Sequence, residues 1–311
     1  IQEAIKHIRA KTSWLLIWSH CDNFVLGNKL CKHGIREVVD FLARDKEIRL
    51  TSNLITADDK AWRILKHSPE EKKEPVADQI DGLINNIIDW SKAYNLTLKK
   101  VMARLASDSQ EVVLGKLELV PADPVKEGQE VPSPGQSQTD KLKYVLKMAG
   151  AAVFKQDRLV GYLTPAETRG YLRIIDEIKL HSMNIILPED KAPVSLDTYD
   201  SKTQIEWNED SPQTFLIEVK ELCRLAEQKA ELTQTSLEIA NQLEDLKEKA
   251  VSKETKLAIK KAQQLQSDIF GLKGIIKRKD PAAWDKLKDE WDTTFKKLNF
   301  TLKVDSNLKQ A

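Results

Sequence analysis

Few residues in this sequence could do chemistry, and they form no recognisable constellation. The group nearest to a metal site is His20-Cys21 with Cys31 and His33, in which a single residue separates Cys31 from His33. Zinc sites space their paired ligands by about two to five residues, so we expect buried thiols and surface imidazoles here. The sequence also has no glycine-rich phosphate loop, no G-x-S-x-G elbow and no H-E-x-x-H helix. We therefore predict no catalytic residue, no cofactor and no metal.

The remaining titratable residues favour binding over catalysis. The chain has five histidines, none of them in a recognisable motif, and its many acidic residues are typical of solvated faces. An enzyme would need a buried carboxylate or histidine with a shifted pKa. Two non-enzymatic classes remain open, a protein that acts by assembly and a small-molecule binding protein with a concave apolar pocket.

The charge balance argues against nucleic acid as a partner, and the hydropathy argues against a membrane-spanning segment. The chain of 311 residues carries 49 basic and 48 acidic residues, a net charge of +1, and so has no basic excess for a nucleic-acid backbone. It has no apolar run of about 18 residues, so we predict no membrane-spanning segment. Three cysteines are too few for a disulfide framework. Because Ile1 already follows a helical pattern, we expect the natural N-terminus to lie upstream.

Composition and periodicity predict an α+β protein with three mixed domains, in which small β-sheets pack against helices and long C-terminal helices lie on an antiparallel sheet. Residues 121–140, rich in Pro, Gly, Ser and Gln, read as a linker. We expect a mixed N-terminal domain at 1–120, a hairpin–helix domain at 141–186 and an α+β domain at 187–308.

Local signals place the later elements. The apolar segments 141–154 and 158–163 flank a polar turn and predict a β-hairpin. The sequence Thr164-Pro165-Ala166-Glu167 predicts a helix start with a capping box. We expect a helical stretch from about 227 to 276, interrupted near 251–253, and then a helix beginning at Pro281. The alternating residues of 300–304 predict a closing strand at a sheet edge.

Motifs occur at residues 34–49, at 151–163 with 167–170, and at 264–291. They resemble those of the Ger(x)C (GerAC-like) family, which comprises the C subunits of nutrient germinant receptors in spore-forming bacteria. Residues 151–163 (AAVFKQDRLVGYL) with 167–170 (ETRG) are similar to the family's "VFK-x-D-x-LVG-x-L…E-x-RG" signature. Residues 264–291 are similar to its "Q…D-x-FG…P-x-x-W…W" pattern, and residues 34–49 match the family more weakly. The matches occur in the family's order and cover most of the chain.

The resemblance implies a non-enzymatic lipoprotein subunit on the outer face of the spore inner membrane, assembled with the polytopic A and B subunits to trigger germination. The family's signal peptide and its lipid-modified cysteine would lie upstream of Ile1. The alternative is an independent extracytoplasmic nutrient-binding protein. The motif residues are candidates for structural or interface roles, of which we favour the structural one; they are Gly161, Glu167, Arg169, Gly170, Asp268, Gly271, Pro281, Trp284 and Trp291.

Overall fold

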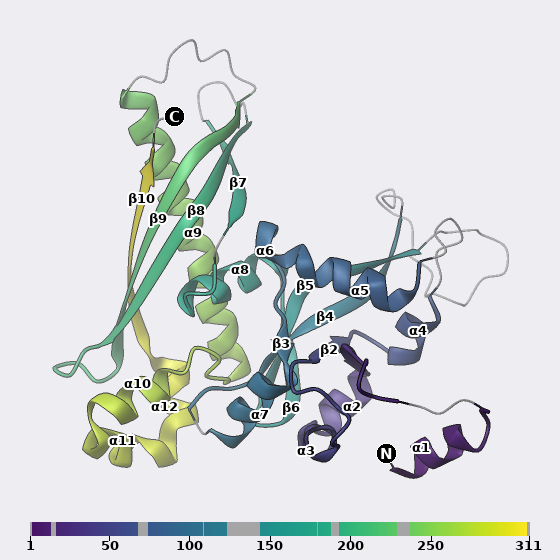
Figure 1. Cartoon of the computed structure of the whole chain (residues 1–311). Coiled ribbons are helices and arrows are strands. Elements are labelled where there is room, and N and C mark those ends of the chain that lie inside the picture. Colours follow the sequence, from purple (N-terminus) through teal and green to yellow (C-terminus); the bar gives the residue numbers. More distant parts are fainter. Residues whose placement is uncertain are drawn as a thin grey trace, which may run out of the picture. The chain divides into compact units, whose positions relative to one another are not determined.

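The computed structural model (Figure 1) divides the chain into two compact units. It describes residues 2–13, 17–67, 74–107, 109–122, 144–178, 180–187, 193–228 and 237–309. The first unit comprises Ile1–Ile84 and Asn95–Gly161, and the second comprises Asn85–Tyr94 and Tyr162–Ala311. Most of the predicted linker, 121–140, lies outside the described residues, and the division of the chain into four parts stays a prediction.

The first unit is built on a mixed six-stranded sheet. The strands are β1 (Asn23–Leu26), β2 (Asn53–Ala57), β3 (Leu96–Thr97), β4 (Val113–Pro121), β5 (Tyr144–Lys155) and β6 (Arg158–Leu163). The order is β1-β2-β4-β5-β6; β1, β2 and β4 are parallel, β5 is antiparallel to β4, and β3 pairs with β2. The side chains from Met148 to Phe154 are buried without interruption, as in a strand covered on both faces. The β5–β6 pair confirms the predicted hairpin.

Short helices precede and connect the strands of the first unit. They are α1 (Gln2–Arg9), α2 (Asn28–His33), α3 (Arg36–Arg44), α4 (Ala61–Lys66), α5 (Val76–Asn85) and α7 (Leu98–Ala106). Because α3 buries Val39 and Leu42, three residues apart, one stripe of this helix faces the core.

The second unit is built on a four-stranded sheet in the order β10-β9-β8-β7. Its strands are β7 (His181–Ile186), β8 (Pro193–Trp207), β9 (Thr214–Gln228) and β10 (Asn299–Leu308). β8 is antiparallel to both β7 and β9, whereas β10 is parallel to β9. Phe215, Ile217 and Val219 are buried on alternate positions of β9, so one face of the sheet carries the core. Burial of each such side chain is worth roughly 1.5–3 kcal/mol.

The helices of the second unit pack on this sheet and on one another. They are α6 (Ile87–Trp90), α8 (Pro165–Ile174), α9 (Leu237–Leu265), α10 (Leu272–Lys279), α11 (Pro281–Leu287) and α12 (Trp291–Lys297), with a 3₁₀ turn at Lys288–Glu290. The long helix α9 runs along the sheet (Figure 1) and packs on α8 and β10. Leu243, Lys247, Val251, Ala258 and Ala262 form its buried stripe.

The structure confirms the α+β class and corrects three details. The C-terminal sheet is mixed, not antiparallel, because β10 is parallel to β9. Residues 227–228 end β9 and are not helical. Helix α9 continues through 251–253 because Val251 is buried while Ser252 and Lys253 lie on its outer side. Within the described residues, no helix combines the length and the apolar character that a membrane span needs.

Candidate functional site

The motif that begins at Glu167 starts helix α8. The Thr164 hydroxyl oxygen accepts a hydrogen bond from the Glu167 backbone N–H at 3.3 Å, and the Glu167 carboxylate accepts one from the Thr164 N–H at 2.7 Å. Pro165 stands at the first helical position, where its missing N–H costs nothing. The predicted capping box is therefore confirmed, and it fixes where α8 begins.

Arg169 and Gly170 bring α8 against α9. Arg169 donates from Nε to Glu254 Oε2 at 2.8 Å, from Nη2 to Glu254 Oε1, and from Nη1 to the carbonyl of Ser182 at 3.3 Å. A Cβ on Gly170 would overlap the carbonyl oxygen of Glu254 and lie 3.0 Å from the Cβ of Ala258. The two helices therefore approach so closely at this point that only glycine fits.

One helical turn after Arg169, Arg173 extends the pair into a buried ion cluster. Arg173 donates from Nε to Glu221 Oε1 at 2.8 Å, and its Nη1 lies 3.5 Å from Glu254 Oε2. Lys247 of α9 lies 3.4 Å from Glu221 Oε2. The side chains of Arg173, Glu221 and Lys247 have 0% exposure. We call these five residues, Arg169, Arg173, Glu221, Lys247 and Glu254, the ion cluster; it links α8, α9 and β9.

The electrostatics of the cluster favour its charged form. Burial by itself would raise the pKa of Glu221, but the neighbouring cations, Arg173 foremost, lower it to about 2. Burial lowers the pKa of His181 to about 3, so its imidazole is neutral at pH 7. Arg173 Nη2 lies 3.4 Å from His181 Nε2, and Lys247 Nζ donates to the Thr198 hydroxyl. Each charge is met by an opposite charge or a hydrogen-bond acceptor, which is the arrangement of a structural network.

The sequence predicted Arg169 and Gly170 but not the rest of the cluster. Arg173 follows Arg169 by four residues and therefore lies on the same helix face, a signal that was available. Lys247 falls in the buried stripe of α9 between Leu243 and Val251, which is a second signal. Glu221 stands in an alternating strand at a buried position, but the sequence does not say which cation reaches it.

Asp268 and Gly271 form the turn between α9 and α10. The buried Asp268 carboxylate accepts hydrogen bonds from the backbone N–H groups of Gly271, Leu272 and Lys273 at 3.0, 3.0 and 2.9 Å. Burial raises the pKa of Asp268 to about 6, although these hydrogen bonds act in the opposite direction. Gly271 has φ of 76°, in the left-handed region that glycine adopts without strain. The pair ends one helix and starts the next.

Pro281, Trp284 and Trp291 belong to a small helical cap. The Asp280 carboxylate accepts from the N–H groups of Ala282 and Ala283 at 3.0 Å, so α11 begins at Pro281 as predicted. The Trp284 and Trp291 rings are buried and lie edge to face, with centroids 5.4 Å apart. This geometry supports core packing, at roughly 0.5–1.5 kcal/mol for the pair beyond its buried area.

In the first unit, the turn of the β5–β6 hairpin lies on the start of α3. The Asp157 carbonyl accepts from the Ile35 N–H at 2.9 Å, and its carboxylate accepts from the Arg36 N–H at 3.4 Å. Gly34 has φ of 140°, and a Cβ there would lie 2.7 Å from Asp157 Oδ2. The structure thus joins the 34–49 motif to the 151–163 motif. Gly161 is half-buried in β6, away from these contacts.

The cysteines and histidines near the start of the chain do not gather. Burial raises the pKa of the Cys31 thiol to about 12, and this thiol lies 3.9 Å from the carbonyl of Leu26. Among the described residues, no group of three His, Cys, Asp or Glu side chains has the geometry to hold a metal ion.

The fold and these motif sites together define a mixed α+β protein. Its motif residues start helices, pack helices together and occupy positions too close for a larger side chain. Two family models match the chain in the order of its units. One is described as the spore germination protein N-terminal domain and matches residues 1–119; the other is described as spore germination B3/GerAC-like, C-terminal, and matches residues 149–311. The chain therefore belongs to the GerAC-like, or Ger(x)C, family of spore germination proteins, as its motifs predict.

Relatives in Bacillus subtilis (strain 168) match over nearly the whole chain. Spore germination protein KC is 25% identical in an alignment of 306 residues that covers 95% of this chain and 72% of that protein. Spore germination protein B3 is 25% identical in an alignment of 290 residues that covers 90% of this chain and 71% of that protein. The crystal structure of the GerBC protein has a TM-score of 0.69 at 19% identity and covers 97% of this chain and 83% of that one. The structural likeness confirms the fold.

Proposed function

We propose that the protein is the non-enzymatic C subunit of a spore nutrient germinant receptor. In this proposal it assembles with the polytopic A and B subunits and helps them to trigger germination. A lipid on a cysteine upstream of Ile1 holds it to the outer face of the spore inner membrane. The supporting observation is that an N-terminal and a C-terminal model of the same family match residues 1–119 and 149–311.

The geometry of the motif residues supports an assembly role over a catalytic one. Arg169, Gly170 and Asp268 each contact a neighbouring element of the second unit. The central charged groups of the ion cluster are shielded, since the side chains of Arg173 and Glu221 have 0% exposure. In this conformation a dissolved substrate has no access to them.

Membrane attachment in this proposal needs protein contacts as well as the lipid. A single acyl chain gives marginal and reversible membrane binding. The folded body must therefore supply further binding energy through contacts with the integral subunits. Those contacts would use exposed surfaces, because the motif residues Gly170 and Trp284 are occupied in packing within the second unit.

The test of the anchor uses the natural gene in its spore-forming host. We expect the protein in the inner-membrane fraction, with a lipid found by mass spectrometry on a cysteine upstream of Ile1. Replacing that cysteine by alanine should move at least part of the protein to the soluble fraction. Recovery of the unchanged protein in the soluble fraction without lipid would refute the anchor. A melting temperature raised by millimolar amino acids or sugars would instead favour an independent nutrient-binding protein.

A further inference from the structure

The outer edge of β10 is satisfied over only half of its length. Asn299 and Lys309 donate their backbone N–H groups to carbonyls on the β9 side, at 2.8 and 2.9 Å. Successive residues of a strand direct their N–H groups to opposite sides, so the even-numbered residues direct theirs away from β9. Ser306 and Leu308 do so, and they donate to the carboxylates of Glu248 and Glu244 on α9 at 3.0 and 2.6 Å.

Helix α9 and β10 run alongside each other with matched spacing. Four residues of a helix rise about 6 Å and two residues of a strand about 6.6 Å, so helix positions four apart follow strand positions two apart. Glu244 contacts Leu308, and Glu248 contacts Ser306. The next two residues of this row on α9, each four residues further along, are Ser252 and Lys256. These two residues lie at the level of Val304 and Leu302.

In the second half of the edge, the outward N–H groups of Leu302 and Val304 are met by no acceptor among the described residues. Lysine carries hydrogen-bond donors and no acceptor, so Lys256 cannot receive the N–H of Leu302. Within the described part of the chain, neither Ser252 nor Lys256 accepts a hydrogen bond from Leu302 or Val304, and no strand pairs with this side of β10. Unsatisfied strand edges are templates for a further strand.

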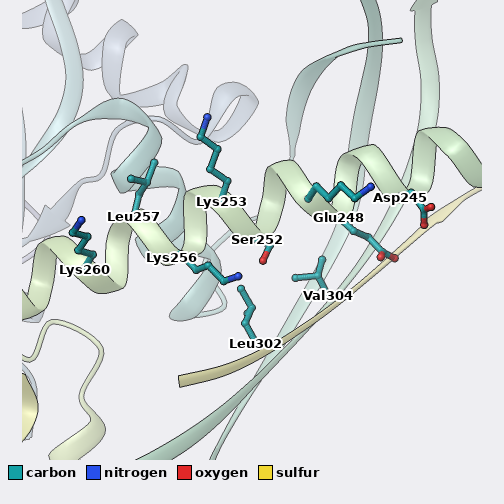
Figure 2. Close-up of a pocket in the computed structure, with 10 residues that line it drawn as sticks. Asp245, Glu248, Ser252, Lys253, Lys256, Leu257, Lys260, Leu302 and Val304 are labelled. Carbon is teal, nitrogen blue, oxygen red and sulfur yellow. The ribbon is translucent and has the colours of Figure 1, made fainter. Parts of the chain in front are cut away.

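A groove lies at this half of the edge (Figure 2). It has a volume of about 650 Å³ and is lined by both α9 and β10. Figure 2 shows Lys256 extending from α9 toward Leu302, with Val304 beside it on the strand. Leu302 and Val304 are half-buried and give the groove an apolar floor.

The groove is cationic. Four exposed lysines line it against two acids; they are Lys249, Lys253, Lys256 and Lys260, with Asp245 and Glu248. Glu248 is already engaged by the N–H of Ser306, and Lys256 is the labelled cation that extends toward Leu302 in Figure 2. An occupant needs backbone acceptors for the strand edge and negative side chains for the lysines.

We propose that this groove binds an extended acidic segment of a partner protein, which adds to the sheet as a fifth strand beside β10. Its backbone carbonyls accept from the N–H groups of Leu302 and Val304, and its Asp or Glu side chains pair with Lys256 and its neighbours. Glu244 and Glu248 of the protein itself fill the same role at the other half of the edge. The proposal stands independently of the receptor assignment.

The test uses the full 311-residue chain and a display library of random twelve-residue peptides. We expect the enriched peptides to carry an excess of Asp and Glu, and to slow hydrogen exchange at the amides of Leu302 and Val304. A library that enriches peptides without acidic excess, or only peptides that leave these two amides unprotected, overturns the proposal. Binding to vesicles of phosphatidylglycerol and phosphatidylcholine in place of peptides also overturns it.

A paired variant separates loss of the site from loss of the fold. Ser252→Glu with Lys256→Glu continues the row of glutamates and supplies the missing acceptors from within the chain. We expect peptide affinity to fall at least tenfold, while exchange at Leu302 and Val304 slows in the free protein. The matched control, Gln204→Glu with Lys220→Glu, makes the same change in net charge at exposed positions of β8 and β9. The affinity of the control variant for the acidic peptides should stay within twofold of the wild-type value. If both variants lose the same peptide affinity, strand addition at this edge is refuted.

Discussion

Replacing Glu221 by glutamine removes the negative charge at the centre of the ion cluster. The carboxylate is 2.8 Å from Arg173 Nε and 3.4 Å from Lys247 Nζ, and all three side chains have 0% exposure. Removal of one partner from a buried pair leaves an uncompensated charge and costs about 3–5 kcal/mol. Glutamine keeps the shape and can still accept one hydrogen bond from Arg173, so we expect a loss near the lower end, about 3 kcal/mol.

The pKa of Glu221 gives a similar estimate of the stability that its charge contributes. Its folded value of about 2, against an ordinary 4.5, corresponds to roughly 3 kcal/mol in favour of the charged form. Because the folded pKa is the lower one, this stability is present above about pH 4.5 and is lost as the pH falls toward 2. The difference between the wild type and Glu221→Gln should therefore narrow as the solution is acidified through this range.

Hydrogen exchange at the buried amides of β9 measures the effect locally. A loss of about 3 kcal/mol should speed exchange there by roughly a hundredfold. Glu218→Gln is the matched control on the same strand, because that carboxylate is 33% exposed and pairs at 3.0 Å with a Lys303 that is 65% exposed. We expect less than about 1 kcal/mol from this surface pair. If the buried amides of β9 exchange equally fast in Glu221→Gln and Glu218→Gln, the ion cluster does not stabilise the second unit.

Three further substitutions test the motif residues. Gly170→Ala should lower the stability of the second unit by about 1–3 kcal/mol in urea, because a Cβ would overlap α9. The control Gly82→Ala has open space around it and should raise stability by about 0.5–1 kcal/mol. If Gly82→Ala were the less stable of the two variants, the close packing of α8 on α9 would be refuted. Asp268 has a folded pKa of about 6, above its ordinary value of 3.8, so folding favours the protonated carboxyl. The stability that this protonation contributes is fully present below pH 3.8 and is lost as the pH rises through 6. Asp268→Asn should flatten the pH dependence of α10 exchange in this range, and an unchanged slope would contradict the assignment. Gly34→Ala should cost the first unit about 1–3 kcal/mol in thermal unfolding, because its φ of 140° and the nearby Asp157 both disfavour a side chain; an unchanged midpoint would refute the strain.

Local chemistry made part of the fold predictable. The β5–β6 hairpin, which ends at Leu163, and the helix start at Thr164 were both predicted correctly. The residues that make a turn or a helix cap lie within a few positions of one another in the sequence. The closing strand at 300–304 was also predicted, since alternation reports a strand. Alternation does not report strand direction, so the parallel pairing of β10 with β9 required the structure.

Long-range partners set the limit of prediction for the candidate site. Arg173 and Glu221 are 48 residues apart in sequence, and a charged residue without its partner in view reads as solvated. The predicted helix break near 251–253 failed for a related reason. Polar residues there lie on the outer side of α9, and the helix ends instead at Leu265, directly before Gln266 with its positive φ.

Co-purification from spore membranes tests the central claim most directly. The protein would be expressed from its natural gene with an affinity tag, and the membrane would be dissolved in mild detergent before capture. The receptor account predicts recovery of two polytopic subunits in constant proportion to the tagged chain, with a tagged unrelated lipoprotein as the control. Recovery of the lipid-anchored chain without polytopic partners, under conditions that keep another membrane complex intact, would contradict it.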